Sequence, residues 1–541
     1  MVVLRNSRDY DPADVKRFIA EGYWNDDTIA TWLDKWARQA PDKIAILGPA
    51  GGITYAELNA KARRVAGAML DLGIGKGEAV AIQLPNMAEY LIAYFGVAMM
   101  GGVLLTMHMP YRGGEMEPLL KHGQARAVIC GAATEKYDAP ATMEGLKASV
   151  PSLEHVIVAT GDTAEVGPGR LSLAEMIEGG PERDITDPPV ASDPVLLCFT
   201  SGTSAQPKAV LRNHYTACAN GRIYSPTIAL TAQDVVMVAP PFTHVFGLSC
   251  VHAALWSGAT NALMELFTPE AYAETIERAR PTVLFTAPAH IAATLKAGFF
   301  ESHDISSLKT VVVAGSVCPP EVAAALEERM SDGGRVGQLF GMTETILIMQ
   351  TPADGPPATR HAHTGQVTRG IEARIMADDG TIQPPGAEGE LQVRGYTIMS
   401  GYLNNAAANE ATFTEDNWMR SGDLAVMEDD GNVAITGRVK DIINRGGIKI
   451  NPTDLESLIT AHRKVVLSAI APMPDDVLGE KACLFVTLVP GAELTLDEVT
   501  AYLGDNDVAK MKWPERLVIL DEMPMTPTRK IIKGELMRLA G

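Results

Sequence analysis

The sequence predicts an α/β protein with a large N-terminal lobe and a small α+β C-terminal domain. The chain has 541 residues, more than a single hydrophobic core normally organises. Strand-like apolar runs alternate with helix-like runs over most of the chain, which is typical of βαβ units with parallel sheets. After about residue 365, short strands separated by turn residues dominate, and a final segment of roughly one hundred residues has its own helix and strand pattern.

The predicted boundary between the two lobes lies at residue 437. We expect residues 1–437 to hold two βα sheets and a small β subdomain, and residues 438–541 to form the small C-terminal domain. The strands expected in the large lobe are Ala79–Leu84, Val103–Thr106, Ala127–Cys130, Val195–Thr200, Val235–Ala239, Val283–Thr286 and Thr310–Ala314, with helices at Met87–Met99 and Gly114–His122. The C-terminal domain is expected to have helices at Leu455–Ala461 and Leu496–Leu503 and strands at Val465–Ala471 and Ala482–Val489.

The composition argues against several classes of partner. The 46 basic and 66 acidic side chains give a net charge of −20, which repels nucleic acid and anionic lipid. Apolar residues make up 46% and charged residues 21%, as in a folded globular protein. The six cysteines are far apart and form no CxxC pair, which favours reduced thiols in a cytoplasmic protein over disulfides or a metal cluster.

One apolar stretch raises the question of a membrane span. Leu91–Met109 is interrupted by Gly101 and Gly102 and is followed by Pro110. A buried helix that leads into a buried strand explains this pattern better than a span. The N-terminus also lacks the apolar core of a signal peptide. We therefore expect a cytoplasmic protein with no membrane span and no nucleic-acid partner.

The most specific chemical signal lies between Val195 and Lys208. An apolar strand leads directly into a loop rich in hydroxyl groups and glycine. Hydroxyl donors, accessible backbone amides and a cation are the groups that bind a polyphosphate. The candidate phosphate-binding residues are Thr200, Ser201, Gly202, Thr203, Ser204 and Lys208. The loop is not a Walker A loop, because Pro207 and Ala209 replace its glycine and its Ser/Thr. The alternative is a Ser/Thr-rich surface turn, which the buried strand before the loop makes less favourable.

With this loop, the sequence resembles the adenylate-forming (AMP-binding) superfamily of acyl-CoA synthetases, aryl-acid ligases, peptide-synthetase adenylation domains and firefly luciferase. Within it, the chain looks most like the acyl-CoA synthetase and aryl-acid–CoA ligase branch. The resemblance covers nearly the whole chain, and five motifs occur in the family's order. Besides the loop, these are QLFGMTET (338–345), WMRSGDL (418–424), GRVKDIINRGGIKINP (437–452) and PMTPTRK (524–530). One match could arise by chance, but five in order do not.

The resemblance implies a set of roles around an ATP molecule. Phe340 would face the adenine, with Gly341 and Met342 in the same element, and Gly315, Ser316 and Val317 would line the base and the acyl group. Thr343 would hydrogen-bond the α-phosphate, and Glu344 would supply the oxygen ligand that Mg²⁺ prefers. Asp423, assisted by Arg438, would bind the ribose hydroxyls. Lys530 would bridge the attacking carboxylate and the α-phosphate in an in-line displacement. For any of these residues taken alone, a turn or solvated side chain is the simpler interpretation.

The resemblance also implies a rotating C-terminal domain that uses coenzyme A. Rotation about Lys440 would remove Lys530 from the site after adenylation. It would bring in the loop at Gly446 and Gly447, which leaves room for a pantetheine arm, with Lys449 nearby. The alternative for this segment is a hairpin with solvated charges.

Three residues depart from the family's pattern. Ala205 and Ala209 stand where the phosphate loop usually has glycine, and Arg529 stands where the C-terminal loop does. If such a site needs a positive φ, the replacement costs about 1 kcal/mol. We expect the departures to affect the rate and not the class of reaction.

The segment PFTHVFGL (241–248) carries information on the acid. It resembles the P-x-x-H-x-x-G element of acyl-CoA synthetases, in which the histidine, here His244, lies beside the acyl pocket. Amino-acid-activating relatives carry an aspartate in this segment for the substrate ammonium; none is present here, which disfavours amino acids. Residues 442–447 look closest to the dihydroxybenzoate-activating branch, but Val245 stands where that branch has an asparagine. The pocket residues Val245, Phe246, Gly247, Val317 and Met342 favour an aromatic, alicyclic or medium-chain acid. A hydrogen-bonded core histidine is an equal alternative for His244.

Four functions remain open at this stage. The first is an acid–CoA ligase that uses ATP and Mg²⁺, with coenzyme A as co-substrate. The second is an aryl-acid adenylating enzyme that loads a carrier protein. The third is a luciferase-like oxygenase, and the fourth is a nucleotide-binding protein that has lost activity. The sequence is compatible with a homodimer and leaves the oligomeric state open.

Overall fold

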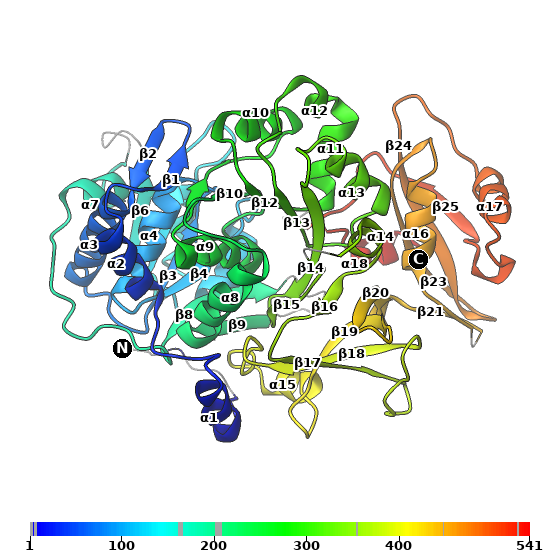
Figure 1. Cartoon of the computed structure of the whole chain (residues 1–541), viewed down its shortest axis with the longest axis horizontal. Helices are drawn as coiled ribbons and strands as arrows, with labels where there is room; N and C mark the ends of the chain where they lie inside the picture. Colours follow the sequence, from blue (N-terminus) through cyan, green and yellow to red (C-terminus); the bar gives the residue numbers. More distant parts are fainter. Residues whose placement is uncertain are drawn as a thin grey trace. The chain divides into compact units, whose positions relative to one another are not determined.

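The structure is a computed structural model that describes residues 4, 8–160, 166–200, 208–352, 355–446, 448–526 and 530–540. The chain divides into two compact units (Figure 1). The first unit comprises Met1–Glu372 and Arg394–Asn417, and the second comprises Ala373–Val393 and Trp418–Gly541. The predicted α/β class, with a large N-terminal part of several sheets and a smaller C-terminal domain, is confirmed. The predicted domain boundary at residue 437 stays a prediction. It marks the hinge of a proposed rotation, whereas the two units are defined by their compactness.

A seven-stranded sheet forms one half of the first unit. Its strand order is β7-β6-β5-β3-β4-β8-β9, and all neighbours are parallel except β8 and β9. The predicted strands at 79, 103, 127 and 195 are all present. The strands are β3 (Ala79–Gln83), β4 (Val103–Thr106), β5 (Ala127–Gly131), β6 (His155–Ala159), β7 (Leu171–Ser172), β8 (Pro194–Thr200) and β9 (Lys208–Asn213).

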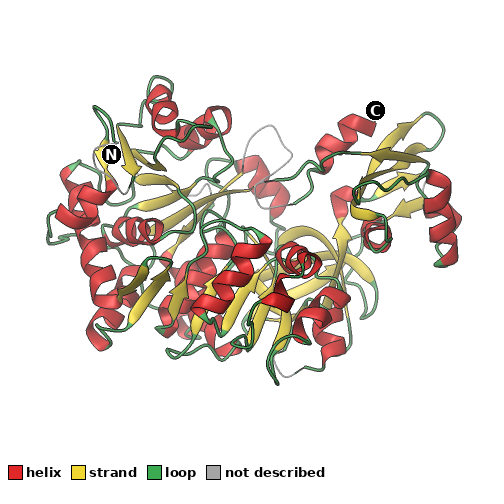
Figure 2. Ribbon diagram, turned by 90° about the horizontal axis from the view of Figure 1, so that it is seen from above, coloured by secondary structure: helices red, strands yellow, loops and turns green. Residues whose placement is uncertain are grey.

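This sheet is buried on both faces, which explains why its strands are continuously apolar. Alternate residues of β3 enter different clusters: Val80 and Ile82 pack with helices α3 and α4, whereas Ala79 and Ala81 pack with α5 and α6. Figure 2 shows helices on both sides of the strands. The four helices are α3 (Tyr55–Asp71), α4 (Ala88–Met99), α5 (Gly113–His122) and α6 (Ala139–Leu146).

A second sheet of the first unit carries the predicted site residues 315–317 and 340–344 and the segment of His244. Within this unit its order is β16-β15-β14-β13-β12-β10-β11-β1-β2, with parallel pairing from β1 through β14. The strands are β1 (Ile44–Gly48), β2 (Gly51–Thr54), β10 (Val235–Val238), β11 (Thr260–Ala262), β12 (Val283–Thr286), β13 (Thr310–Val313), β14 (Arg335–Met342), β15 (Ile346–Gln350) and β16 (Gly365–Val367).

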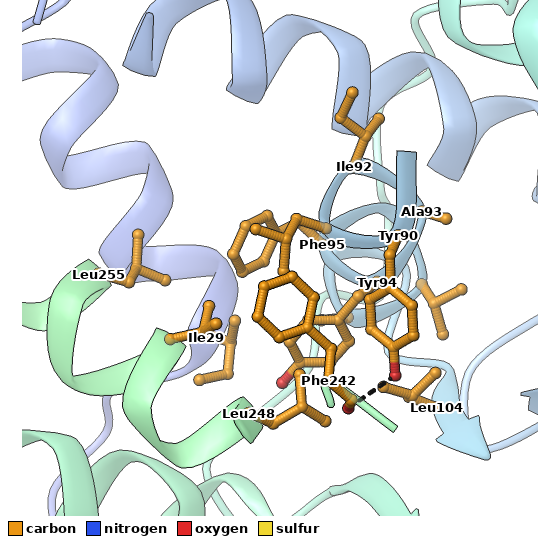
Figure 3. Close-up of a cluster of buried hydrophobic side chains, with 14 of the residues drawn as sticks. Ile29, Tyr90, Ile92, Ala93, Tyr94, Phe95, Leu104, Phe242, Leu248 and Leu255 are labelled. Atoms are coloured by element: carbon orange, nitrogen blue, oxygen red, sulfur yellow. Dashed lines mark hydrogen bonds between the residues drawn. The ribbon is translucent and has the colours of Figure 1, made fainter. Parts of the chain in front are cut away.

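Helices α4 and α9 enclose a dense apolar cluster at the centre of the first unit. In Figure 3, Phe95 from α4 and Leu248 and Leu255 from α9 converge with Ile29 from α2. Helix α9 also packs along α8. The remaining helices of the unit are α1 (Pro12–Ala20), α2 (Ile29–Gln39), α7 (Leu173–Gly179), α8 (His214–Thr227), α9 (Val245–Ser257), α10 (Pro269–Ala279), α11 (Pro288–Ala297), α12 (Phe299–Ser302), α13 (Pro320–Glu327), α14 (Pro357–Ala362) and α15 (Ala406–Thr412).

The apolar stretch Leu91–Met109 folds as expected into the end of α4 and the strand β4. Both elements are buried in the first unit. Among the helices of the described residues, none has the length and apolar character that a bilayer crossing requires.

The second unit contains an antiparallel meander and a small five-stranded sheet. Apolar residues of α16 and α17 form a cluster with one set of residues of that sheet, and α18 forms a cluster with another set. The meander strands are β17 (Ile371–Met376), β18 (Glu388–Gly395), β19 (Met419–Met427) and β20 (Asn432–Arg438). The other elements are η2 (Val439–Asp441), β21 (Ile443–Arg445), β22 (Ile448–Ile450), α16 (Pro452–Thr460), β23 (Val465–Asp475), β24 (Gly479–Leu488), α17 (Leu496–Asp505), η3 (Lys510–Lys512), β25 (Arg516–Ile519) and α18 (Lys533–Ala540).

Candidate active site

Parallel register brings three of the predicted segments to one edge of the second sheet. Val238 on β10 is paired with Phe285 on β12, Thr286 with Val313 on β13, and Val313 with Gln338 on β14. The segments that follow β10 and β13, and the end of β14, therefore leave the sheet at the same edge. These are residues 241–247, 315–317 and 340–342, as expected for a site at the carboxyl ends of parallel strands.

Thr343 and Glu344 lie in the tight turn between β14 and β15. Both are buried, with 9% and 7% of their surface exposed. The hydroxyl of Thr345 accepts a hydrogen bond from the Met342 amide at 3.1 Å and so closes the turn. Ile346 has a φ of +56°, which is strained for a β-branched residue. The turn thus holds a polar pair in a defined, sterically costly conformation.

A buried arginine supports this turn from β9. Arg212 is 1% exposed, and its Nε and Nη2 donate to the Thr343 carbonyl at 3.2 and 2.6 Å. Its Nη1 donates to the Thr397 carbonyl at 2.9 Å. Burial lowers the pKa of Arg212 to about 10, so the guanidinium stays charged at neutral pH. Arg212 therefore ties the strand after the phosphate loop to the backbone beside Glu344.

Tyr402 contacts Glu344 directly. Its hydroxyl donates to Glu344 Oε1 at 2.8 Å, and the Met399 amide donates to the Glu344 carbonyl at 2.8 Å. Burial, and next the charge of Glu344, raise the pKa of Tyr402, which keeps the phenol a donor. The phenol therefore engages Oε1 of the carboxylate.

The predicted phosphate loop connects β8 and β9. Thr200 ends β8 and is paired with Lys208, the first residue of β9. Ser201, Gly202, Thr203 and Ser204 lie outside the described residues, as does Ala205. The Lys208 ammonium lies 5.1 Å from the ring centroid of Tyr402. Ala209 is buried in β9 without a positive φ, so its replacement of glycine causes no backbone strain.

The segment 241–248 is held in place by polar side chains that lie outside the predicted motifs. Asn86 donates to the carbonyls of Val238 and Pro240 and accepts from the Phe242 amide at 2.7 Å. The Tyr90 hydroxyl donates to the Phe242 carbonyl at 2.9 Å (Figure 3). Because these bonds fix the backbone, the orientation of the whole segment is defined before any ligand binds.

His244 is the N-cap of α9, and its Nδ1 accepts from the Phe246 amide at 3.2 Å. Its ring lies 6.3 Å from the ring of His108, measured between centroids. His108 Nδ1 is hydrogen-bonded to the hydroxyl of Thr243 at 2.9 Å, and burial lowers the pKa of His108 to about 4. The neutral His108 thus packs beside the segment that carries His244.

The residues predicted to line the acyl pocket differ in exposure. Val245 is buried, Phe246 and Met342 are half-buried, and Val317 is 52% exposed. Gly315 and Ser316 are exposed as well. Gly247 lies so close to the Pro241 carbonyl that a Cβ would approach its oxygen to 2.2 Å. Phe340 is half-buried at the end of β14.

In the second unit, Asp423 and Arg438 form an ion pair. They are opposite each other on β19 and β20, and Arg438 Nε lies 2.8 Å from Asp423 Oδ1. Gly422 has a φ of +71°, and the Asp423 amide donates to the Ser421 hydroxyl at 3.0 Å. The Ser-Gly-Asp sequence therefore lies at an irregularity within β19 and presents a largely buried carboxylate.

The predicted hinge segment forms η2 and the β21–β22 hairpin. Lys440 is exposed in η2, Gly446 has a φ of +58°, and Gly447 lies outside the described residues. Lys449 forms an ion pair with Asp378 on the second unit's surface. This pair agrees with the alternative of solvated charges for Lys449.

Lys530 lies at the base of a loop closed by its own backbone. The Thr526 amide donates to the Lys530 carbonyl at 2.7 Å, and the Lys530 amide donates to the Thr526 hydroxyl at 3.0 Å. Met525 and Ile531 form a β-bridge. Residues 527–529, including Arg529, lie outside the described residues, and Lys530 itself is exposed.

The structure thus brings Lys208, Thr343 and Glu344 together through Arg212 and Tyr402, and it pairs Asp423 with Arg438. Lys530, Lys440 and Lys449 belong to the second unit. In the described ranges, no three His, Cys, Asp or Glu side chains gather as a metal site. One hint of Arg212 is its position as a charged residue directly after the apolar run 209–211; no sequence signal indicates Tyr402.

Comparison with known proteins shows the family of this chain. Residues 33–403 match the sequence family described as AMP-binding enzyme, and residues 454–530 match its C-terminal domain. The chain belongs to the AMP-binding enzyme family. The resemblance found in the sequence is therefore confirmed, and the protein is an enzyme of a family of adenylate-forming acid–thiol ligases.

Three similar proteins illustrate the range of this family. The "Salicyl-AMP ligase / salicyl-S-ArCP synthetase" of Mycobacterium tuberculosis is 33% identical, over 98% of this chain and 94% of its own. The "Medium-chain fatty-acid–CoA ligase" of Escherichia coli is 31% identical, over 95% and 90%. The crystal structure of ATP-bound MatB from Rhodopseudomonas palustris has a TM-score of 0.83 and 26% identity, over 94% of this chain and 98% of its own.

Proposed function

We propose that this AMP-binding enzyme is an ATP-dependent carboxylic acid–CoA ligase. In the first half-reaction, a carboxylate oxygen attacks the α-phosphorus of ATP, the bond to the bridging oxygen breaks, and pyrophosphate leaves. In the second, the thiol of coenzyme A attacks the acyl carbon, loses its proton, and AMP leaves. The observation that carries the proposal is the network of Lys208, Tyr402 and Glu344, in which the last two residues are buried.

The residues of the first unit suit the phosphate end of ATP. Lys208 supplies a positive charge, and Thr343 supplies a hydroxyl for the α-phosphate. Glu344 suits Mg²⁺, because the ion prefers one or two carboxylates together with phosphate oxygens and water. Bound there, Mg²⁺ would neutralise charge on the phosphates. Phe340 and the 315–317 segment are proposed to hold the adenine, and Asp423 with Arg438 the ribose.

Lys530 is proposed to be the catalytic cation of adenylation. Its ammonium would stabilise negative charge on the attacking carboxylate and the α-phosphate. Residues 438–541 are proposed to rotate about Lys440 between the half-reactions, so that the Gly446–Gly447 loop replaces Lys530 near the pantetheine arm. Lys449 is the weakest of these assignments because its ammonium already has a carboxylate partner.

The substrate class is proposed from the segment 241–248 and its surroundings. Val245, Phe246 and Met342 offer an apolar surface, and no carboxylate occurs in the segment to receive a substrate ammonium. An aromatic, alicyclic or medium-chain acid fits this chemistry. His244 would contact the acyl group or its adenylate from the start of α9.

A second acceptor is favoured by one observation. The 33% identical relative is named "Salicyl-AMP ligase / salicyl-S-ArCP synthetase", a name that gives ArCP as the acceptor of its acyl group. Loading of a carrier protein is therefore the alternative for the second half-reaction. Both alternatives share the adenylation step.

A panel of acids tests the first half-reaction and the substrate class together. Aliphatic, alicyclic and aromatic acids, with salicylate among them, would be scored by pyrophosphate release and by trapping of the adenylate with hydroxylamine. Coenzyme A and a pantetheine-bearing carrier protein would then be compared as acceptors. Pyrophosphate release without any dependence on the acid would refute the proposal.

Lys530→Ala tests the role of the C-terminal lysine. We expect adenylation from ATP to fall by about 100-fold, since a positioned charge in the transition state is lost. Thioester formation from supplied acyl-adenylate should change less than about threefold, because Lys530 is absent from that step. Lys512→Ala, at an exposed position of the same unit, is the control. Equal losses in both half-reactions would contradict the rotating-domain mechanism.

A further inference from the structure

Tyr402 is a buried residue that none of the five sequence motifs contains. It is 3% exposed and lies in the first unit, after β18. Its side chain makes two contacts with groups assigned to ATP binding. The hydroxyl donates to Glu344 Oε1 at 2.8 Å, and the ring lies 5.1 Å from the Lys208 ammonium.

The backbone around Tyr402 is fixed to the strand that follows the phosphate loop. Tyr402 forms a β-bridge with Val210 on β9, and the Leu403 amide donates to the Ala209 carbonyl at 2.8 Å. Asn409 holds the other side: its Oδ1 accepts from the Tyr402 amide at 2.6 Å, and its Nδ2 donates to the Tyr402 carbonyl at 3.2 Å. These bonds hold the backbone of Tyr402 in place, so its ring makes both contacts from a fixed position.

The two oxygens of the Glu344 carboxylate can serve different partners. Oε1 accepts the phenol hydrogen bond, which leaves Oε2 available to a different partner. A donor on one oxygen fixes the rotation of the carboxylate and directs the other oxygen to a cation. The same ring presents its face to the Lys208 ammonium and restricts where that charge can lie.

We propose that Tyr402 is a positioning residue that orients Glu344 for Mg²⁺ through its hydroxyl and Lys208 for the phosphates through its ring. The inference rests on the proposed function, because it assumes that Glu344 and Lys208 bind MgATP. Tyr402 acts through these two residues and takes no part in bond making or breaking.

Tyr402→Phe removes the hydroxyl and keeps the ring. The half-saturating Mg²⁺ concentration in acid-dependent ATP–pyrophosphate exchange should rise at least about tenfold, as for other residues that orient a metal ligand. Binding of Mn²⁺ to the enzyme–ATP complex, measured by electron paramagnetic resonance, should weaken by a similar factor. ATP affinity in EDTA and thioester formation from supplied acyl-adenylate should stay within about twofold of wild type, because neither involves the metal.

Two further variants separate positioning from a loss of stability. Tyr55→Phe also removes a buried hydroxyl, which donates to the Ala259 carbonyl at 2.7 Å, and it should leave the Mn²⁺ affinity unchanged. In a Glu344→Gln background, Tyr402→Phe should have no further effect on Mn²⁺ binding, because the group it orients is already lost.

An unchanged Mn²⁺ affinity in a folded Tyr402→Phe enzyme would overturn the inference. So would an equal effect of Tyr402→Phe in the wild-type and Glu344→Gln backgrounds. Failure of the proposed function would look different: no acid in the panel would then stimulate exchange in the wild type. The Mn²⁺ measurement still tests Tyr402 in that case, since it requires ATP but no acid.

Discussion

Gly341 is the residue whose identity the backbone around the site restricts most strongly. A Cβ at this position would lie 1.9 Å from the carbonyl oxygen of Ile346 and 3.1 Å from the Cα of Leu347. The neighbouring strand is part of the same hairpin, so it cannot move without changing the Thr343–Glu344 turn. Ile346 already has a φ of +56° there. The glycine thus serves close packing of two strands and not a special dihedral angle.

We expect Gly341→Ala to lower the free energy of unfolding by at least about 2 kcal/mol, because the hairpin must separate to admit the methyl group. Adenylation should fall at least about tenfold even in the folded fraction, since Glu344 moves with the turn. Urea denaturation and pyrophosphate exchange measure the two effects. Gly131→Ala, at a strand end where a Cβ meets nothing within 4 Å, is the control and should change neither. Similar behaviour of the two variants would refute this account of Gly341.

At the scale of an element, α9 begins at the segment that we assign to the acyl group. Eleven of its thirteen residues are buried, so packing on all sides and not an amphipathic stripe stabilises it. His244 caps its first turn, while Asn86 and Tyr90 fix the residues before it. The N-cap role therefore explains in part why position 244 is a histidine. The proposed contact with the acyl group is a second, independent role.

The variants His244→Asn and His244→Ala distinguish these two roles. Asparagine is a strong N-cap, so His244→Asn should melt close to the wild type, whereas His244→Ala should lose about 1 kcal/mol of stability. If the imidazole also contacts the acyl group or adenylate, both variants should lose about tenfold or more in kcat/KM for the acid. Differential scanning fluorimetry and pyrophosphate release provide the measurements. A fully active His244→Asn enzyme would leave His244 with the capping role alone.

Three buried histidines make the stability of the whole protein depend on pH. Burial lowers the pKa of His108 to about 4 and that of His214 and His252 to about 3. Each is neutral in the folded protein, and His252 Nε2 is hydrogen-bonded to the Tyr94 hydroxyl at 2.7 Å. In the unfolded chain the same groups bind a proton near pH 6.5. The unfolded state therefore binds more protons between about pH 6.5 and pH 4.

The contribution of these histidines to the free energy of unfolding should therefore be complete above pH 7 and should decrease as the pH drops below 6.5. Each histidine contributes a slope of about 1.4 kcal/mol per pH unit below that value. Urea unfolding followed at pH 7, 6 and 5 tests the expectation. His252→Gln can keep the hydrogen bond to Tyr94 but cannot titrate. The slope of its unfolding free energy against pH should therefore be shallower by the contribution of a single histidine. An unfolding free energy that is constant from pH 7 to pH 5 would contradict the assignment of these histidines as neutral.

Much of the architecture is encoded in patterns that are local in the sequence. Apolar runs of strand length predicted β3, β4, β5, β8, β10, β12 and β13 within one or two residues at their ends. The order of the five motifs predicted the family, which the comparison with known proteins confirmed. These features could be predicted because burial on both faces of a parallel sheet requires continuous apolar residues, and because each motif is contiguous.

The supports of the candidate site were decided by the tertiary structure alone. Arg212 reaches the carbonyl of Thr343, 131 positions away, and Tyr402 reaches Glu344, 58 positions away. Asn86 reaches the amide of Phe242 across 156 positions. A polar side chain at a buried position needs a partner, but its local sequence does not say which one. The sequence by itself thus determined which segments carry the chemistry, and only the packing of distant strands determined what holds them in place.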